Sequence, residues 1–125
     1  MSDLENPRDL VLTEIKDGIG KITMNRPQSL NCINLESMEL LIQALQQLLG
    51  DPEVRVVILT GKGRAFCAGA DQGDMVERQP GEWEEIVERY LDPIRLIARS
   101  DKPVIASING DAVGGGLGLA IASDL

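Results

Sequence analysis

The sequence predicts an α/β fold built on a parallel sheet, and three observations support this prediction. Residues 54–60 and 103–108 are nearly unbroken apolar runs, as expected for strands buried on both faces of a parallel sheet. Segments with apolar residues at helical spacing lie between and after these strands. The 125 residues, 43% of them hydrophobic, allow one domain with its own core but not two. The expected order is β-β-α-β-α-β-α with parallel crossovers.

A β-hairpin is the first structure expected along the chain. Residues 10–16 and 19–25 are predicted to be short strands, and Asp17-Gly18 between them is typical of a two-residue hairpin turn. Pro27 ends the second strand, because proline has no N–H to donate to a neighbouring strand.

The next element is a helix that begins after Asn34, whose side chain is suited to cap its first turn. Gly50 and Pro52 end this helix. One of its faces is apolar at helical spacing, with Leu35, Met38, Leu41, Ile42, Leu45, Leu48 and Leu49.

A second helix is predicted from the apolar spacing between Trp83 and Ala98. Inside it, Asp92-Pro93 has the pattern of a cap followed by proline at the first helical position, so the helix is expected to restart or kink there. After the strand at 103–108, residues 117–122 are predicted to open a third helix.

Two glycine-bearing loops are the most informative feature for function. Residues 66–71 (Phe-Cys-Ala-Gly-Ala-Asp) come after the strand at 54–60, and residues 109–116 (Asn-Gly-Asp-Ala-Val-Gly-Gly-Gly) follow the strand at 103–108. Taken singly, residues 66–71 are explained by an ordinary surface loop, and the glycine triplet by a tight strand-to-helix turn packed against a neighbouring element. Together they end two parallel strands, which is where α/β sheets bind ligands. Two such loops place backbone N–H groups around one oxygen, as an oxyanion hole does.

Composition excludes several classes of function. The net charge of −8 and the absence of a Lys/Arg cluster argue against a nucleic-acid partner. The chain has no histidine, so Ser-His-Asp, Cys-His and imidazole–metal sites are excluded, and any catalysis must use carboxylates and backbone dipoles. Two cysteines are too few for a disulfide framework or a zinc site, and no metal is expected.

The glycine triplet does not fit the common nucleotide-binding motifs. A G-x-G-x-x-G/A pattern fails because Leu119 and Ile121 stand where a third small residue is needed. Gly61-Lys62 lacks the remaining Walker A residues. The polar, acidic amino terminus and the absence of a long apolar run predict a cytoplasmic protein with no membrane partner.

Five segments, in this order, carry a family resemblance: residues 22–27, 56–61, 65–71, 102–110 and 114–120. With them, the chain resembles the enoyl-CoA hydratase/isomerase (crotonase) superfamily. The resemblance implies a crotonase-like (ClpP/crotonase) spiral of repeated ββα units, incomplete in this chain. Residues 1–125 would form the amino-terminal part of a single domain, and the full-length protein would be a homotrimer or hexamer.

The resemblance also implies the site. The backbone N–H groups of Ala70 and Gly115 would hold the thioester oxygen of an acyl-CoA, where the charge of an enolate collects. Coenzyme A would belong to the substrate, with no separate cofactor. Arg26, Lys62 and Arg64 would be the cations nearest its phosphates, or solvated surface charges. The full set of substrate-binding residues implied is Arg26, Ala65, Phe66, Ala68, Ala70, Asp71, Gln72, Gly73, Gly114, Gly115 and Gly118.

The sequence departs from the family pattern at Gly118, where hydratases carry a catalytic glutamate. Double-bond isomerisation, with one carboxylate supplied from beyond Leu125, is therefore favoured over simple hydration. A non-catalytic acyl-CoA-binding or assembly subunit and a general nucleotide-binding module are the alternatives. This chain alone is expected to be inactive. The carboxylates near the loops are weak candidates for proton transfer, and capping of turns is the favoured interpretation for Asp71, Asp74 and Asp111. Cys67 is interpreted as a small buried residue rather than a nucleophile.

Overall fold

The computed structural model describes residues 9–71, 73 and 79–124. Its main sheet has the order β1-β2-β3-β5, with bounds Val11–Lys16, Ile19–Met24, Val56–Gly61 and Val104–Ser107. β1 is antiparallel to β2, whereas β2, β3 and β5 run parallel to one another. The predicted α/β class and parallel crossovers are therefore confirmed.

The hairpin is confirmed in its details. Asp17 and Gly18 both have positive φ, 52° and 82°, which is the backbone of the two-residue turn expected from this dipeptide. The register pairs Lys16 with Ile19 next to the turn. A short 3-10 helix, η2 (Pro27–Ser29), follows β2.

α1 (Leu35–Gly50) begins and ends as predicted. The Asn34 side chain accepts from the Ser37 N–H at 2.8 Å, and the Ser37 hydroxyl accepts from the Asn34 N–H at 2.9 Å. This reciprocal capping box satisfies two amide groups that would otherwise lack partners. The apolar face of α1 packs on the sheet, and the buried residues of this core include Ile22, Met24, Leu41, Leu45, Leu48, Val57, Leu59 and Val104.

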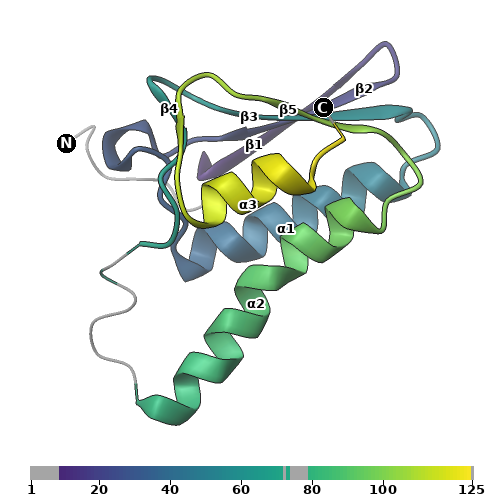
Figure 1. The fold of residues 1–125 in the computed structure, drawn as a ribbon. Helices are drawn as coiled ribbons and strands as arrows, with labels where there is room; N and C mark the ends of the chain where they lie inside the picture. The colour runs from purple at the N-terminus through teal and green to yellow at the C-terminus, as the bar shows by residue number, and fades with distance from the viewer. Residues whose placement is uncertain (1–8, 72, 74–78, 125) are drawn as a thin grey trace.

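The three helices cover one face of the main sheet, and the first part of α2 extends away from the body of the molecule (Figure 1). β3 consequently alternates between buried and half-buried residues. Its predicted burial on both faces is wrong for the described part of the chain, because Val56, Ile58 and Thr60 are only half-buried.

α2 (Pro80–Ala98) is one helix with Pro93 inside it, so of the predicted restart or kink at Asp92-Pro93 the restart is wrong. The Asp92 carboxylate does not cap a new helix. It instead accepts from the Arg89 guanidinium at 2.8 Å. Pro93 is fully buried, and this packing offsets the loss of one helical hydrogen bond.

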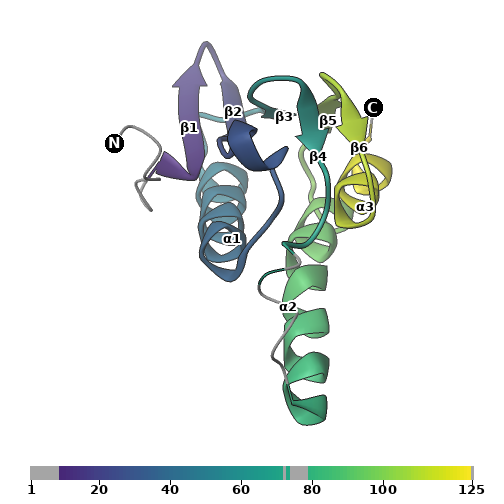
Figure 2. The same cartoon turned by 90° about the vertical axis from the view of Figure 1, so that its left-hand side faces the viewer.

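The glycine-bearing segments contain two short strands that the sequence analysis missed. β4 (Ala65–Cys67) and β6 (Asp111–Ala112) pair in parallel and form a second, two-stranded sheet, which Figure 2 shows above α3. Phe66 and Cys67 are fully buried, so this segment is not an ordinary surface loop.

α3 (Gly115–Ala122) begins two residues before the predicted start at 117. Three glycines in succession give a weak helix signal in the sequence, and the close packing of α3 on β4 overrides it. Within the described residues, no helix combines the length and apolar character that crossing a membrane requires.

Candidate functional site

The structure brings the two glycine-bearing loops into contact. The Val113 N–H donates to the Cys67 carbonyl at 3.0 Å, which extends the β4–β6 pairing. Gly69 has a φ of +99°, and a Cβ at this position would lie 3.0 Å from the Val113 oxygen and 3.5 Å from the Gly115 nitrogen. Only glycine combines this conformation with so close an approach.

Neither the Ala70 N–H nor the Gly115 N–H donates a hydrogen bond to any residue that the structure describes. Gly115 opens α3, so its N–H has no carbonyl one turn earlier in the helix. Ala70 forms an isolated parallel bridge with Ile33, in which the flanking Gly69 carbonyl and Asp71 N–H make the hydrogen bonds. In such a bridge the N–H of the central residue points to the opposite side.

Ala70 and Gly115 line one pocket of about 250 Å³. The wall opposite them belongs to α2 and comprises Val87, Tyr90, Leu91, Pro93 and Ile94. Ile33, Met38 and Leu119 complete the lining, and no carboxylate is among the described residues of this wall. An apolar pocket beside two N–H donors that have no partner among the described residues suits a carbonyl compound with a hydrocarbon tail.

Gly118 lies on the side of α3 that faces α2. A Cβ at this position would be 3.0 Å from the Ile94 Cδ1 atom. Ile94 also lines the pocket, so a methyl group occupies the space beside position 118.

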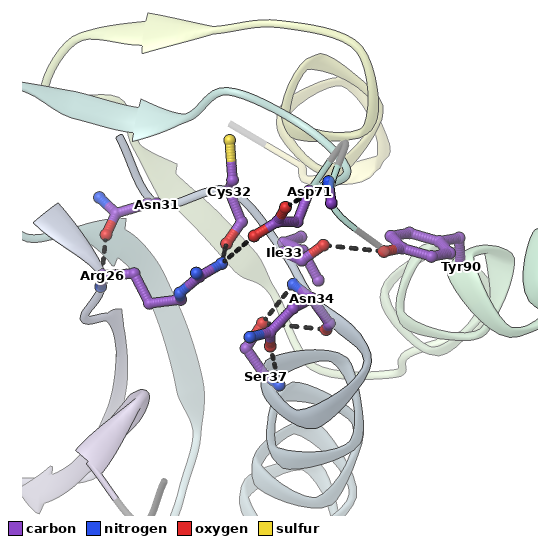
Figure 3. A network of polar contacts seen from close by, with 9 residues as sticks. Arg26, Asn31, Cys32, Ile33, Asn34, Ser37, Asp71 and Tyr90 are labelled. Carbon is purple, nitrogen blue, oxygen red and sulfur yellow. Dashed lines mark hydrogen bonds and ion pairs between the residues drawn. The ribbon is translucent and has the colours of Figure 1, made fainter. Parts of the chain in front are cut away.

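Arg26 is not exposed to solvent in the way expected for a cation that binds phosphate. Its side chain is only 10% exposed, and its guanidinium contacts the Asp71 carboxylate at 3.1 Å and the Cys32 carbonyl at 2.6 Å. The other Asp71 oxygen accepts from the Gly73 N–H at 2.8 Å. Figure 3 shows Arg26, Cys32 and Asp71 joined in this way. Because both carboxylate oxygens are engaged, we assign neither phosphate binding to Arg26 nor proton transfer to Asp71.

The remaining predicted residues occupy several environments. Ala65 and Phe66 have buried side chains, so only their main chain can meet a ligand. Lys62 and Arg64 are exposed in the turn between β3 and β4. Ala68 is half-buried, while Gly73, Gly114 and Asp111 are exposed. Gln72 and Asp74 lie outside the described residues.

Two asparagines hold the turn between β3 and β4 in place. The Asn31 amide donates to the Lys62 and Ala65 carbonyls at 3.0 and 2.8 Å. The Asn109 amide donates to the Gly63 and Ala65 carbonyls at 2.8 and 3.0 Å. Sequence reasoning missed both roles, because each joins segments more than thirty residues apart.

Sequence reasoning also missed α2 as the pocket wall. The signal was present, since Val87, Tyr90, Leu91 and Ile94 recur at helical spacing, but the same spacing is typical of any packed helix.

A larger cavity of about 570 Å³ lies between α1 and α2, and none of the predicted site residues lines it. Its charges are already paired in part, because Arg89 binds both Glu39 and Asp92. The size of this cavity therefore does not make it the functional site.

Burial raises the pKa of the Cys67 thiol to about 11. A raised pKa keeps the thiol neutral and unreactive up to well above pH 8, as expected for a packing residue. At pH 8 the thiolate fraction, and with it the rate of alkylation by iodoacetamide, is expected to be about 10²-fold lower than for an unperturbed thiol. Mass spectrometry of alkylated Cys67 in the native protein and in denaturant measures this difference. Equal rates in both conditions would contradict the assignment.

Comparison with known proteins gives a consistent result. Residues 14–125 match the family model for enoyl-CoA hydratase/isomerase. The chain is 37% identical over 121 residues to the 1,2-epoxyphenylacetyl-CoA isomerase of Escherichia coli, and the alignment covers 94% of this chain and 46% of that protein. It is 38% identical over 119 residues to the (E)-benzylidenesuccinyl-CoA hydratase of Thauera aromatica, covering 92% of this chain and 45% of that protein.

The fold agrees with solved structures of the same family. The enoyl-CoA hydratase of Bacillus anthracis superposes with a TM-score of 0.88 at 34% identity, over 93% of this chain and 46% of that one. The chain thus spans about half the length of the relatives it matches, and its described part is an incomplete crotonase fold. With a family model matching nearly its whole length, the chain belongs to the enoyl-CoA hydratase/isomerase family.

Proposed function

We propose that the protein containing this chain binds an acyl-CoA thioester and stabilises its enolate with the N–H groups of Ala70 and Gly115. The observation that carries the proposal is a pair of backbone donors at one apolar pocket, neither of which has a partner among the described residues. Loss of a proton beside a thioester places negative charge on the carbonyl oxygen. Preorganised donors stabilise that charge more in the transition state than in the ground state. The positive end of α3, at Gly115, adds to the field.

The reaction we propose is migration of a double bond rather than addition of water. A base removes a proton from C2 of a 3-enoyl-CoA, the double bond moves to C2–C3, and the same carboxylic acid returns the proton to C4. Glycine at 118 and the Ile94 methyl group beside it offer no second carboxylate that could act as the base that activates water. The carboxylate that moves the proton lies outside the described residues in this proposal.

The rest of the proposal follows from the family. Residues 1–125 form the first part of one crotonase-like domain, and the complete protein assembles as a homotrimer or hexamer, which light scattering measures. Lys62 and Arg64 remain the proposed contacts of the CoA phosphates, because both are exposed. A non-catalytic acyl-CoA-binding subunit is the second candidate, favoured by the absence of a carboxylate from the described pocket wall.

Calorimetric titration of the complete protein that contains this chain with butanoyl-CoA, ATP and NAD tests the proposed ligand. We expect binding of butanoyl-CoA alone, since the pocket is apolar and the sequence lacks the nucleotide-binding motifs. Binding of ATP or NAD without butanoyl-CoA would support a nucleotide-binding module instead. Turnover of a 3-enoyl-CoA separates the isomerase from the non-catalytic subunit, and hydration of a 2-enoyl-CoA in preference to isomerisation would contradict the proposed reaction.

A further inference from the structure

A partly buried ion pair joins the two chain segments that flank the candidate site. Arg26 follows β2, and its Nη1 atom donates both to the Cys32 carbonyl at 2.6 Å and to the Asp71 carboxylate at 3.1 Å. The Arg26 N–H in turn donates to the Asn31 side chain at 2.8 Å. One guanidinium thus fixes the segment before α1 against the residue that follows Ala70 (Figure 3).

The direction of the Ala70 N–H follows from the peptide bond that contains it. In a planar trans peptide, the carbonyl of one residue and the N–H of the next point in opposite directions. The Gly69 carbonyl accepts from the Ile33 N–H at 2.7 Å, so the Ala70 N–H points away from Ile33. The Asp71 N–H donates to the Ile33 carbonyl at 2.8 Å. This second hydrogen bond fixes the orientation of the next peptide group, between Ala70 and Asp71.

The position of Ile33 therefore determines where the Ala70 donor points. Arg26 holds the neighbouring residue through the Cys32 carbonyl, and the Tyr90 hydroxyl donates to the Ile33 carbonyl at 2.8 Å. Figure 3 shows Tyr90 on the far side of Ile33 from Arg26. Tyr90 also lines the pocket, so one side chain supports the loop and forms the wall.

The ion pair is more than a surface contact. The two side chains are only 10% and 28% exposed, so removing either partner leaves a charge in a poorly solvated place. The loop would then move to solvate that charge. Since Asp71 is bonded directly to Ala70, such a movement displaces the donor.

We propose that Arg26, through its ion pair with Asp71 and its bond to the Cys32 carbonyl, is a positioning residue that orients the Ala70 N–H toward the substrate oxygen. This inference rests on the proposed function, because it concerns the same donor. It assigns Arg26 and Asp71 to the support of that donor and not to phosphate binding or proton transfer.

The inference is tested in the complete protein by isotope-edited infrared spectroscopy of bound butanoyl-CoA that is labelled with ¹³C at the carbonyl. Two aligned donors lower the carbonyl stretching frequency. We expect Arg26→Met to abolish most of this shift and to lower kcat for a 3-enoyl-CoA by about 10- to 100-fold, because a small misplacement of a catalytic group has effects of this size. KM should change much less, since the pocket wall on α2 is unaltered.

Matched variants separate positioning from general destabilisation. Arg89→Met also removes an arginine held by two carboxylates, but Arg89 lies outside the candidate site, so the carbonyl shift should stay at the wild-type value. Arg26→Lys keeps the charge opposite Asp71 and should restore part of the shift. Asp71→Asn provides a milder variant of the same shape if Arg26→Met does not fold.

The outcomes are distinguishable. A wild-type protein that binds butanoyl-CoA without any carbonyl shift contradicts the proposed function itself. A wild-type shift that persists unchanged in folded Arg26→Met or Asp71→Asn overturns the positioning role alone. Loss of the shift in Arg89→Met to the same extent as in Arg26→Met would also overturn it, because the effect would then follow stability.

Discussion

Replacing Gly115 with proline is expected to lower kcat by about 10²- to 10³-fold, the usual loss when one oxyanion donor is removed. Gly115 is the first residue of α3, a position where proline fits because its φ is preset for a helix and its missing N–H has no helical partner. The substitution therefore removes the donor and leaves the helix in place. Steady-state turnover of a 3-enoyl-CoA, with thermal unfolding as the check on folding, measures the effect.

Alanine at the same position is the control. A Cβ at 115 would meet nothing closer than the Gly69 Cα atom at 4.0 Å, and alanine keeps the N–H. Activity close to wild type is expected for Gly115→Ala. Ala70→Pro and Ala70→Gly make an equivalent pair on the other loop. If proline and alanine at 115 give the same turnover, Gly115 is not a donor in the reaction.

Gly116→Ala is expected to lower the free energy of unfolding by about 3 kcal/mol, at the upper end of overpacking costs. A Cβ at 116 would overlap the carbonyl oxygen of Cys67 in β4. The Cβ is fixed directly to the α3 backbone and its partner is a backbone oxygen, so no side-chain rotation relieves the contact and α3 must move away from β4. Urea denaturation of the variant and the wild type gives the difference.

Gly118→Ala, two residues along the same helix, is the matched control. Its new methyl group would meet the Ile94 Cδ1 atom at 3.0 Å, and this flexible end of a side chain can turn aside. Alanine also favours the helix by about 1 kcal/mol relative to glycine, so a near-neutral result is expected. Equal denaturation midpoints for the two variants would contradict the proposed contact between Gly116 and β4.

Local sequence signals predicted the elements that depend on neighbouring residues. Asp17-Gly18 determined the hairpin turn because its backbone preferences suit positive φ. Asn34 determined where α1 begins, because its side chain bonds an amide three residues ahead. The same reasoning wrongly allowed a new helix to start at Asp92-Pro93, where burial of Pro93 and the Arg89–Asp92 bond favour continuation of α2.

Long-range contacts were not predictable in the same way. The β4–β6 pairing joins residues 65–67 to 111–112, and two- or three-residue strands carry no periodicity of their own. The Arg26–Asp71 ion pair spans 45 positions, so the sequence left open whether Arg26 binds phosphate or is a solvated surface charge. The α2 wall of the pocket was visible only as an ordinary apolar helix face.

The amino-acid sequence by itself determined the α/β class, the hairpin, the capped α1 helix and the two small-residue loops, because these features follow from interactions within a few residues. The tertiary structure decided that the two loops meet and that Ala70 and Gly115 share one apolar pocket. It also decided that Arg26 forms an ion pair with Asp71. Those outcomes depend on packing between segments far apart in the chain, where burial and backbone pairing outweigh local preference.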